Sequence, residues 1–329
     1  MFFTLSFSKS ETSFIYCAEA KASEAKDTPE ERETKFRFLP DFGERLIDKK
    51  KPTLYLFKWT DSIKAGEESS DLETSVAPLK PTLPEGSTFV FGQGTFTPDN
   101  KYIFATGYPE TLDGRRLGPF GCWNHPSSIF KLKLPDTIPT DSKEINLEAE
   151  QITSLDISAR SPRVTDANSD TPYTTVWLEN RGPAHASVTS LVSLHSREGK
   201  AKVLVDYVQE PKTPGDFPGL YIDQLPSRPF LSLDADAQES THVVSHSNWG
   251  SHQDILAISL KTGDVWNMTS SQDYAYVVAG TDGQDGLLAV RSAINSPFEL
   301  LETRVVAGKN TKWKAIDKPV LADWGLFYS

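Results

Sequence analysis

The histidines between residues 242 and 252 come nearest, by type and spacing, to a chemical site in this chain. Imidazole nitrogens bind metals and act as general bases, and His242 and His246 would share one face of a strand because four is an even step. No carboxylate or thiolate at ligand spacing completes a metal site with His252. We therefore interpret the three histidines as ordinary strand and loop residues, and predict no metal ligands and no cofactor.

Nucleophilic catalysis has an equally weak sequence signature. Serine hydrolases on α/β folds place the nucleophile in G-x-S-x-G, where the glycines permit the strained turn that exposes the hydroxyl. That pattern does not occur here, and Gly250-Ser251-His252 lacks its flanking residues and falls between predicted strands. A Ser-His-Asp triad assembled from distant residues is the alternative, but no spacing points to one. The sequence therefore predicts no catalytic residues.

Three further motifs are interpreted as structural. Residues 281–286 (TDGQDG) resemble a calcium loop but lack the EF-hand spacing and the terminal glutamate, so we predict a turn. Gly92-Gln93-Gly94 is not followed by a helix pattern and predicts no phosphate loop. Arg115-Arg116 is interpreted as a surface or channel-lining pair, because two basic residues do not make a nucleic-acid site.

Composition narrows the class of protein that could carry such motifs. With 329 residues, 38% of them hydrophobic, the chain can bury a sizeable core. Its formal net charge of −11 argues against binding to nucleic acid or to an anionic membrane, both of which need clustered Lys and Arg. No apolar stretch is long enough to span a bilayer, and the first residues alternate like a strand rather than a signal peptide.

The chain has two cysteines, Cys17 and Cys122, which suits a reducing compartment and cannot form a disulfide scaffold. We predict that both are small buried residues, with a pairing between them left open. The expected location is the cytoplasm.

Short β patterns dominate the elements that must position these residues. Runs rich in Val, Ile, Phe, Tyr and Thr are separated by Pro, Gly, Asp and Asn, and no amphipathic helix of normal length is evident outside one charged segment. A degenerate unit of strands and turns recurs about five times, near residues 2–59, 89–135, 150–208, 219–270 and 273–308. This repeat predicts an all-β fold, a β-propeller with four-stranded antiparallel blades.

Two segments interrupt the repeat. Residues 18–35 are charged and almost free of apolar side chains, and residues 60–88 are acidic and contain Pro78, Pro81 and Pro84. We predict that both are solvated loop insertions, and that residues 1–329 form a single propeller domain.

Several short blocks, in the same order along residues 1–270, resemble the propeller domain of the acylaminoacyl peptidases of the prolyl oligopeptidase family. The likeness is moderately specific, fades after about residue 275, and includes no catalytic residue. The blocks are residues 3–20, 36–59, Gly107-Tyr108-Pro109, Arg116-Leu117-Gly118 with Cys122 and Asn124, Ser128-Ile129-Phe130, residues 155–164 (LDISARSPRV), Gly219-Leu220-Tyr221 with Leu225-Pro226, and residues 253–258 with Thr262-Gly263.

The resemblance implies a function for the chain as a module. Family members have more propeller before the point that corresponds to Met1, and an α/β-hydrolase domain with the Ser-Asp-His triad after Ser329. None of those catalytic residues has a counterpart here, so this chain would be about five of an original seven blades. It would cap the active site and admit only short N-acylated peptides, while a hydrolase domain supplies the chemistry.

Two other expectations follow. The alternative function is a stand-alone propeller that binds protein partners, since fold alone does not decide function. A propeller that lacks blades leaves apolar blade faces open to water, so we also expect a homo-oligomer.

Overall fold

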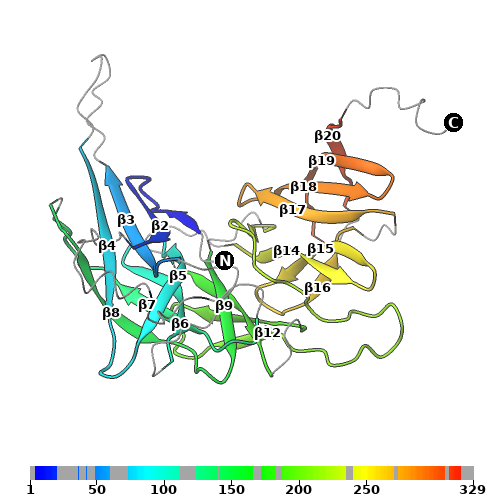
Figure 1. Cartoon of the computed structure of the whole chain (residues 1–329). Helices are drawn as coiled ribbons and strands as arrows, with labels where there is room; N and C mark the ends of the chain where they lie inside the picture. The colour runs from blue at the N-terminus through cyan, green and yellow to red at the C-terminus, as the bar shows by residue number, and fades with distance from the viewer. Residues whose placement is uncertain are drawn as a thin grey trace, which may run out of the picture. The chain divides into compact units, whose positions relative to one another are not determined.

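The computed structural model describes residues 4–20, 36, 42, 49–59, 73–111, 123–139, 141–165, 172–182, 187–234, 240–269, 273–307 and 311–319. Over these residues the regular structure is entirely β, with no α-helix and none of the long apolar helices that could cross a membrane. The all-β prediction is therefore confirmed (Figure 1). The strands are β1 Leu5–Phe7, β2 Ser13–Glu19, β3 Pro52–Trp59, β4 Thr74–Thr82, β5 Phe89–Phe96, β6 Tyr102–Pro109, β7 Ser128–Lys133, β8 Ile145–Gln151, β9 Ser158–Val164, β10 Thr174–Asn180, β11 Ser190–His195, β12 Lys202–Val205, β13 Phe230–Leu231, β14 His242–Trp249, β15 His252–Ser259, β16 Val265–Asn267, β17 Ala275–Thr281, β18 Gly286–Ala293, β19 Ser296–Arg304 and β20 Lys314–Asp317.

These strands form repeated four-stranded antiparallel groups. The last three groups are separate sheets, with the orders β12-β11-β10-β9, β13-β14-β15-β16 and β17-β18-β19-β20. The first eight strands form one sheet, β1-β2-β3-β4-β8-β7-β6-β5, in which two such groups meet through a parallel pairing of β4 with β8. Within the part of the chain that the structure describes, the sequence repeat thus corresponds to five groups of four strands, as the propeller prediction requires.

One predicted loop insertion is partly wrong. Within residues 60–88, which we predicted to be solvated, β4 is a nine-residue strand that pairs with β3 and with β8. Ala77 and Leu79 of this strand are buried in the core, and this alternate burial holds the segment in the sheet despite its prolines. Of the other predicted insertion, 18–35, residues 18 and 19 end β2, and residues 21–35 lie outside the described residues.

Period-two alternation explains why these segments become strands. In β3, Leu54 and Leu56 are buried while the residues between them are half exposed. The buried positions join side chains of β5, β6 and β7 in one hydrophobic cluster, which includes Ile15, Ile103 and Leu132. The burial of these apolar side chains makes the largest favourable contribution to the folding free energy of a sheet whose other face meets water.

The chain divides into two compact units. The first comprises residues 1–164 and 168–187, and the second comprises residues 165–167 and 188–329. The second unit has its own cluster, built from Leu231 and Val244 of β13 and β14 with Val278, Leu287 and Leu301 of the last sheet. The prediction of one domain over residues 1–329 stays a prediction.

Cys17 behaves as the sequence suggested. Its thiol is free and buried on β2, and burial raises its pKa to about 12, with a backbone hydrogen bond from Thr53 opposing the shift. A thiol held neutral in this way is a packing residue and not a nucleophile. Cys122 lies outside the described residues.

Candidate functional site

A cluster of fully buried polar side chains lies where β9 packs against β5 and β6 in the first unit. We call Gln93, Thr106, Arg160, Ser161 and Asn180 the buried polar cluster; they come from β5, β6, β9 and β10. Polar groups are rarely buried this deeply without hydrogen bonds, so their contacts show what the arrangement does.

Gln93 links two strands through its side-chain oxygen. Its Oε1 accepts hydrogen bonds from Thr106 Oγ1 and from the backbone N–H of Ser161, both at 2.8 Å. Gln93 and Ser161 also have positive φ angles of 53° and 59°, which L-residues adopt at a cost. The register shift between Gly92 and Thr95 is a β-bulge that accommodates Gln93. Two strained residues therefore meet through one hydrogen bond.

Arg160 occupies the other side of the cluster and is only 2% exposed. Its guanidinium donates to Asn180 Oδ1 and lies over the ring of Trp123, 4.6 Å from the ring centroid. Asn180 in turn donates from Nδ2 to Ser187 Oγ at 2.7 Å. The planar charge is thus held by an amide oxygen and by an aromatic face, and stacking on the ring favours Arg over Lys.

Two titratable groups beside the cluster have shifted pKa values for the same reason. Burial lowers the pKa of Arg163 to about 10, and its Nη1 donates to the carbonyl of Pro162. Burial raises the pKa of Tyr108, against the opposing charge of Arg160. Neither group changes its proton near neutral pH, so neither can serve as a general base. The hydrogen bonds of the cluster position β5, β6, β9 and β10 against one another.

The candidate histidines lie in the second unit. His242 Nδ1 lies 2.8 Å from Thr241 Oγ1, and His252 Nε2 lies 3.4 Å from Ser251 Oγ on the surface. Burial lowers the pKa of His242, and it also lowers that of His246, where Asp223 opposes the shift. No group of three or more metal-ligating side chains occurs among the described residues. That the histidines hold no metal stays a prediction.

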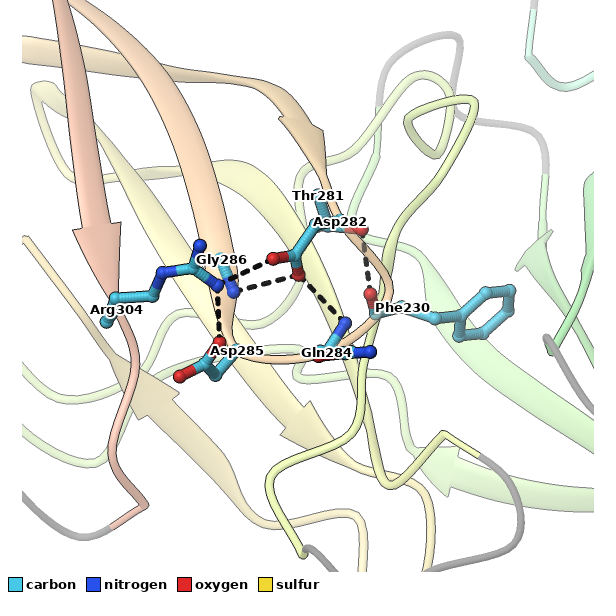
Figure 2. Close-up of polar contacts among 7 residues, drawn as sticks. All are labelled: Phe230, Thr281, Asp282, Gln284, Asp285, Gly286 and Arg304. Carbon is cyan, nitrogen blue, oxygen red and sulfur yellow. Dashed lines mark hydrogen bonds and ion pairs between the residues drawn. The ribbon is translucent and has the colours of Figure 1, made fainter.

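Residues 281–286 form the turn between β17 and β18 (Figure 2). Asp282 Oδ1 accepts the backbone N–H groups of Gln284 and Gly286, and Arg304 Nη1 lies 2.7 Å from Asp282 Oδ2 and 2.6 Å from Asp285 Oδ1. Burial acts to raise the pKa of Asp282, but these donors outweigh it and hold the pKa below its ordinary value. Both carboxylates of the calcium-like sequence are therefore paired with one arginine of the same chain.

The remaining motifs have different outcomes. Gly92-Gln93-Gly94 lies in β5, and Gln93 joins the buried polar cluster, a role that sequence reasoning missed. Ser161 is part of the block that carried the family resemblance, but nothing in either segment indicated that they meet. Arg115-Arg116 lies outside the described residues. The glycines on both sides of Gln93 were the one usable indication, because glycine inside a strand often accompanies a bulge.

Comparison with known proteins agrees with this architecture. The family model described as "Acylamino-acid-releasing enzyme, N-terminal domain" matches residues 5–323. An acylamino-acid-releasing enzyme of Arabidopsis thaliana is 26% identical over 298 residues, which cover 85% of this chain and 36% of that protein. The chain thus spans little more than a third of this relative.

Two solved structures share the fold at low sequence identity. Prolyl oligopeptidase B of Galerina marginata aligns with a TM-score of 0.52 and 10% identity, over 97% of this chain and 34% of that chain. A structure from a study of two prolyl endopeptidases aligns with a TM-score of 0.52 and 14% identity, over 97% of this chain and 36% of that chain. In both alignments this chain covers about a third of the larger enzyme.

Proposed function

Because the chain belongs to the family of acylamino-acid-releasing enzyme N-terminal domains, we propose that it is the non-catalytic propeller of such an enzyme, acting as substrate gate and size filter. In this proposal an α/β-hydrolase domain supplies the serine chemistry, and the substrates are short peptides with a blocked N-terminus. The family match over residues 5–323, on a β-propeller fold with four-stranded blades, carries the proposal.

The physical basis of a size filter is the stiffness of the blades. The sheets of β1–β8 and of β13–β20 are held by backbone hydrogen bonds and by close-packed hydrophobic clusters, so we expect their edges not to give way to a bulky substrate. A flexible peptide can enter an opening that sterically rejects a folded domain, and this selection requires no catalytic group in the propeller. The buried polar cluster contributes by fixing β9 against β5 without taking part in proton transfer. The paucity of cysteine favours a cytoplasmic location.

A length series of blocked peptides tests the gate. This chain would replace the matching N-terminal segment of the Arabidopsis relative, and kcat/KM would be measured for acetylated peptides from a few residues to a folded domain. We expect the fusion to discriminate against the long substrates by about a hundredfold, or ~2.7 kcal/mol in activation free energy. The control is the remainder of that enzyme without any propeller, which should cleave short and long substrates alike. Equal kcat/KM for both lengths in the fusion would contradict the gate.

We also propose that the isolated chain self-associates through the first sheet. The face of β1–β3 opposite the core presents a ladder of aromatic rings, with Phe14 and Phe57 stacked at 4.8 Å. Phe7 and Val76 on this sheet are 46% and 48% exposed, so the apolar surface is incompletely covered. The other rings in the ladder are Tyr16, Tyr55 and Trp59.

Light scattering on the eluted chain measures this self-association. We expect a mass of at least two chains, and a shift to the monomer when Phe7→Glu and Val76→Glu place charges on the aromatic face. Ile294→Glu, at an exposed position of the second unit, is the matched control and should leave the mass unchanged. A wild-type chain that elutes as a monomer at all concentrations would refute the proposal.

A further inference from the structure

A long connection leads from β12 to β13 in the second unit (Figure 1). It exposes two large aromatic side chains. Tyr207 is 39% exposed and Tyr221 is 42% exposed, although both belong to a segment that is firmly attached to the sheets. We call residues 206–223 together with Trp249 the acidic aromatic surface. Exposed aromatic side chains on an ordered segment are typical of binding surfaces, where Tyr and Trp contribute most.

Hydrogen bonds and ring contacts hold this surface in place. Phe217 packs on Trp249 with ring centroids 5.4 Å apart, and Trp249 Nε1 donates to the carbonyl of Gly215 at 3.2 Å. The backbone N–H of Tyr221 donates to Ser247 Oγ of β14 at 2.9 Å. These contacts order the backbone at Tyr221 before any ligand binds, which reduces the entropy lost on binding.

Gly219 brings the two ends of the segment together. Its φ of +95° is a conformation that L side chains rarely adopt, and a β-carbon there would lie 3.1 Å from Val208 Cβ and would collide with Val188. The backbone at Gly219 therefore packs directly against Val208, the residue after Tyr207. The backbone stretches that carry the two exposed tyrosines are thus neighbours, because Tyr207 precedes Val208 and Tyr221 follows Gly219 by two residues.

The charge of the surface is strongly negative. Residues 206–223 contain four carboxylates and a single lysine, within a chain of net charge −11. Asp206 directly precedes Tyr207, and Asp223 follows Tyr221 by two residues. A ligand for this surface must therefore combine positive charge with a face that packs on an aromatic ring. The carboxylates are Asp206, Glu210, Asp216 and Asp223, and the lysine is Lys212.

The chain itself shows which side chain satisfies this combination. In the last sheet, Arg291 lies over the ring of Tyr274 at 4.4 Å from the centroid, and its Nη2 lies 2.7 Å from Glu299 Oε2. A guanidinium is attracted both by the ring face and by the carboxylate, and it is more weakly hydrated than an ammonium group. A tyrosine beside a carboxylate is thus an arginine site already present within this protein.

We propose that the acidic aromatic surface binds an arginine-bearing peptide segment, with guanidinium groups stacked on Tyr207 and Tyr221 and paired with the neighbouring carboxylates. The observation that carries the proposal is the exposure of two ordered tyrosines within a segment of net negative charge. The occupant is a positively charged peptide. Its binding is independent of the peptidase gate, because it requires neither a blocked N-terminus nor a hydrolase domain.

Fluorescence anisotropy with three labelled peptides tests this binding on the intact chain. The peptides share a Gly/Pro-containing backbone and carry three residues of Arg, of Lys or of Gln at the same positions. We expect the Arg peptide to bind more tightly than the Lys peptide and the Gln peptide to bind least, with affinity that falls as salt rises. Equal binding of the Arg and Gln peptides would overturn the proposal.

Substitutions locate the site and separate the contribution of ring stacking from that of charge pairing. Tyr207→Ala with Tyr221→Ala should weaken binding of the Arg peptide about fivefold to tenfold. Asp206→Asn keeps the acceptor for the Tyr207 N–H while removing the charge, so it should weaken binding and reduce the salt dependence. Phe298→Ala, which removes an aromatic residue that is 72% exposed elsewhere on the same unit, is the control for non-specific adhesion. If it weakens binding as much as the tyrosine pair, the proposal fails.

Discussion

Replacing Arg160 by alanine is expected to lower the free energy of unfolding by about 3–5 kcal/mol, because the substitution empties a fully buried site and removes the donor to Asn180. The guanidinium donates to Asn180 and covers Trp123, and it is almost completely withdrawn from water. Alanine would leave a cavity and a buried amide oxygen without this donor, and each of these adds to the cost. Chemical denaturation, followed by circular dichroism and hydrogen exchange of β9 and β10, would measure the loss.

Arg304 provides the matched control. It also contacts two acceptors, Asp282 and Asp285, at distances as short as those of a strong ion pair (Figure 2). Its side chain is 69% exposed, however, so water and salt screen the attraction. Arg304→Ala should therefore change stability much less than Arg160→Ala. If the two substitutions cost the same, burial would not be the reason that Arg160 matters, and the structural role given to the buried polar cluster would be wrong.

The sequence allowed the fold to be predicted where strand alternation and turn residues agreed. Pro98-Asp99-Asn100 is an example of such turn residues: Asn100 adopts a φ of 57°, and Asp99 Oδ1 accepts the N–H of Lys101. β4 escaped prediction because proline counts against a central strand. The alternate burial of Ala77 and Leu79 identifies β4 as a strand only once β3 and β8 are known to lie on either side of it.

The buried polar cluster could not be predicted for a different reason. Gln93 and Ser161 are separated by 68 positions, and their contact depends on how β9 packs against β5, which no local pattern encodes. Their positive φ angles could not be predicted either, since neither residue is a glycine or asparagine, the types that commonly adopt such a conformation. Family resemblance drew attention to residues 155–164, but not to what they contact. Propensity and alternation therefore specify the sheets, whereas the packing between sheets determines the cluster.

Gly263→Ala is expected to destabilise the second unit by about 2–4 kcal/mol, through two separate costs. Gly263 has a φ of +80° in the turn between β15 and β16, which alanine adopts only with strain. A β-carbon at this position would also collide with the backbone carbonyl oxygen of Leu204 in β12. Backbone cannot rotate away as a side chain can, so β12 or the turn must shift. Thermal or chemical unfolding of the purified variant would measure the sum.

Gly250→Ala isolates the first of these costs. Gly250 has a φ of +64° in the turn between β14 and β15, and a β-carbon there would have no neighbour within 4 Å. This variant should lose only about 1 kcal/mol, the price of the backbone conformation alone. The difference between the two variants then measures how closely the β15–β16 turn packs on β12. Equal losses would mean that this contact yields without resistance, and the blade edges would then be too compliant to exclude a substrate by size.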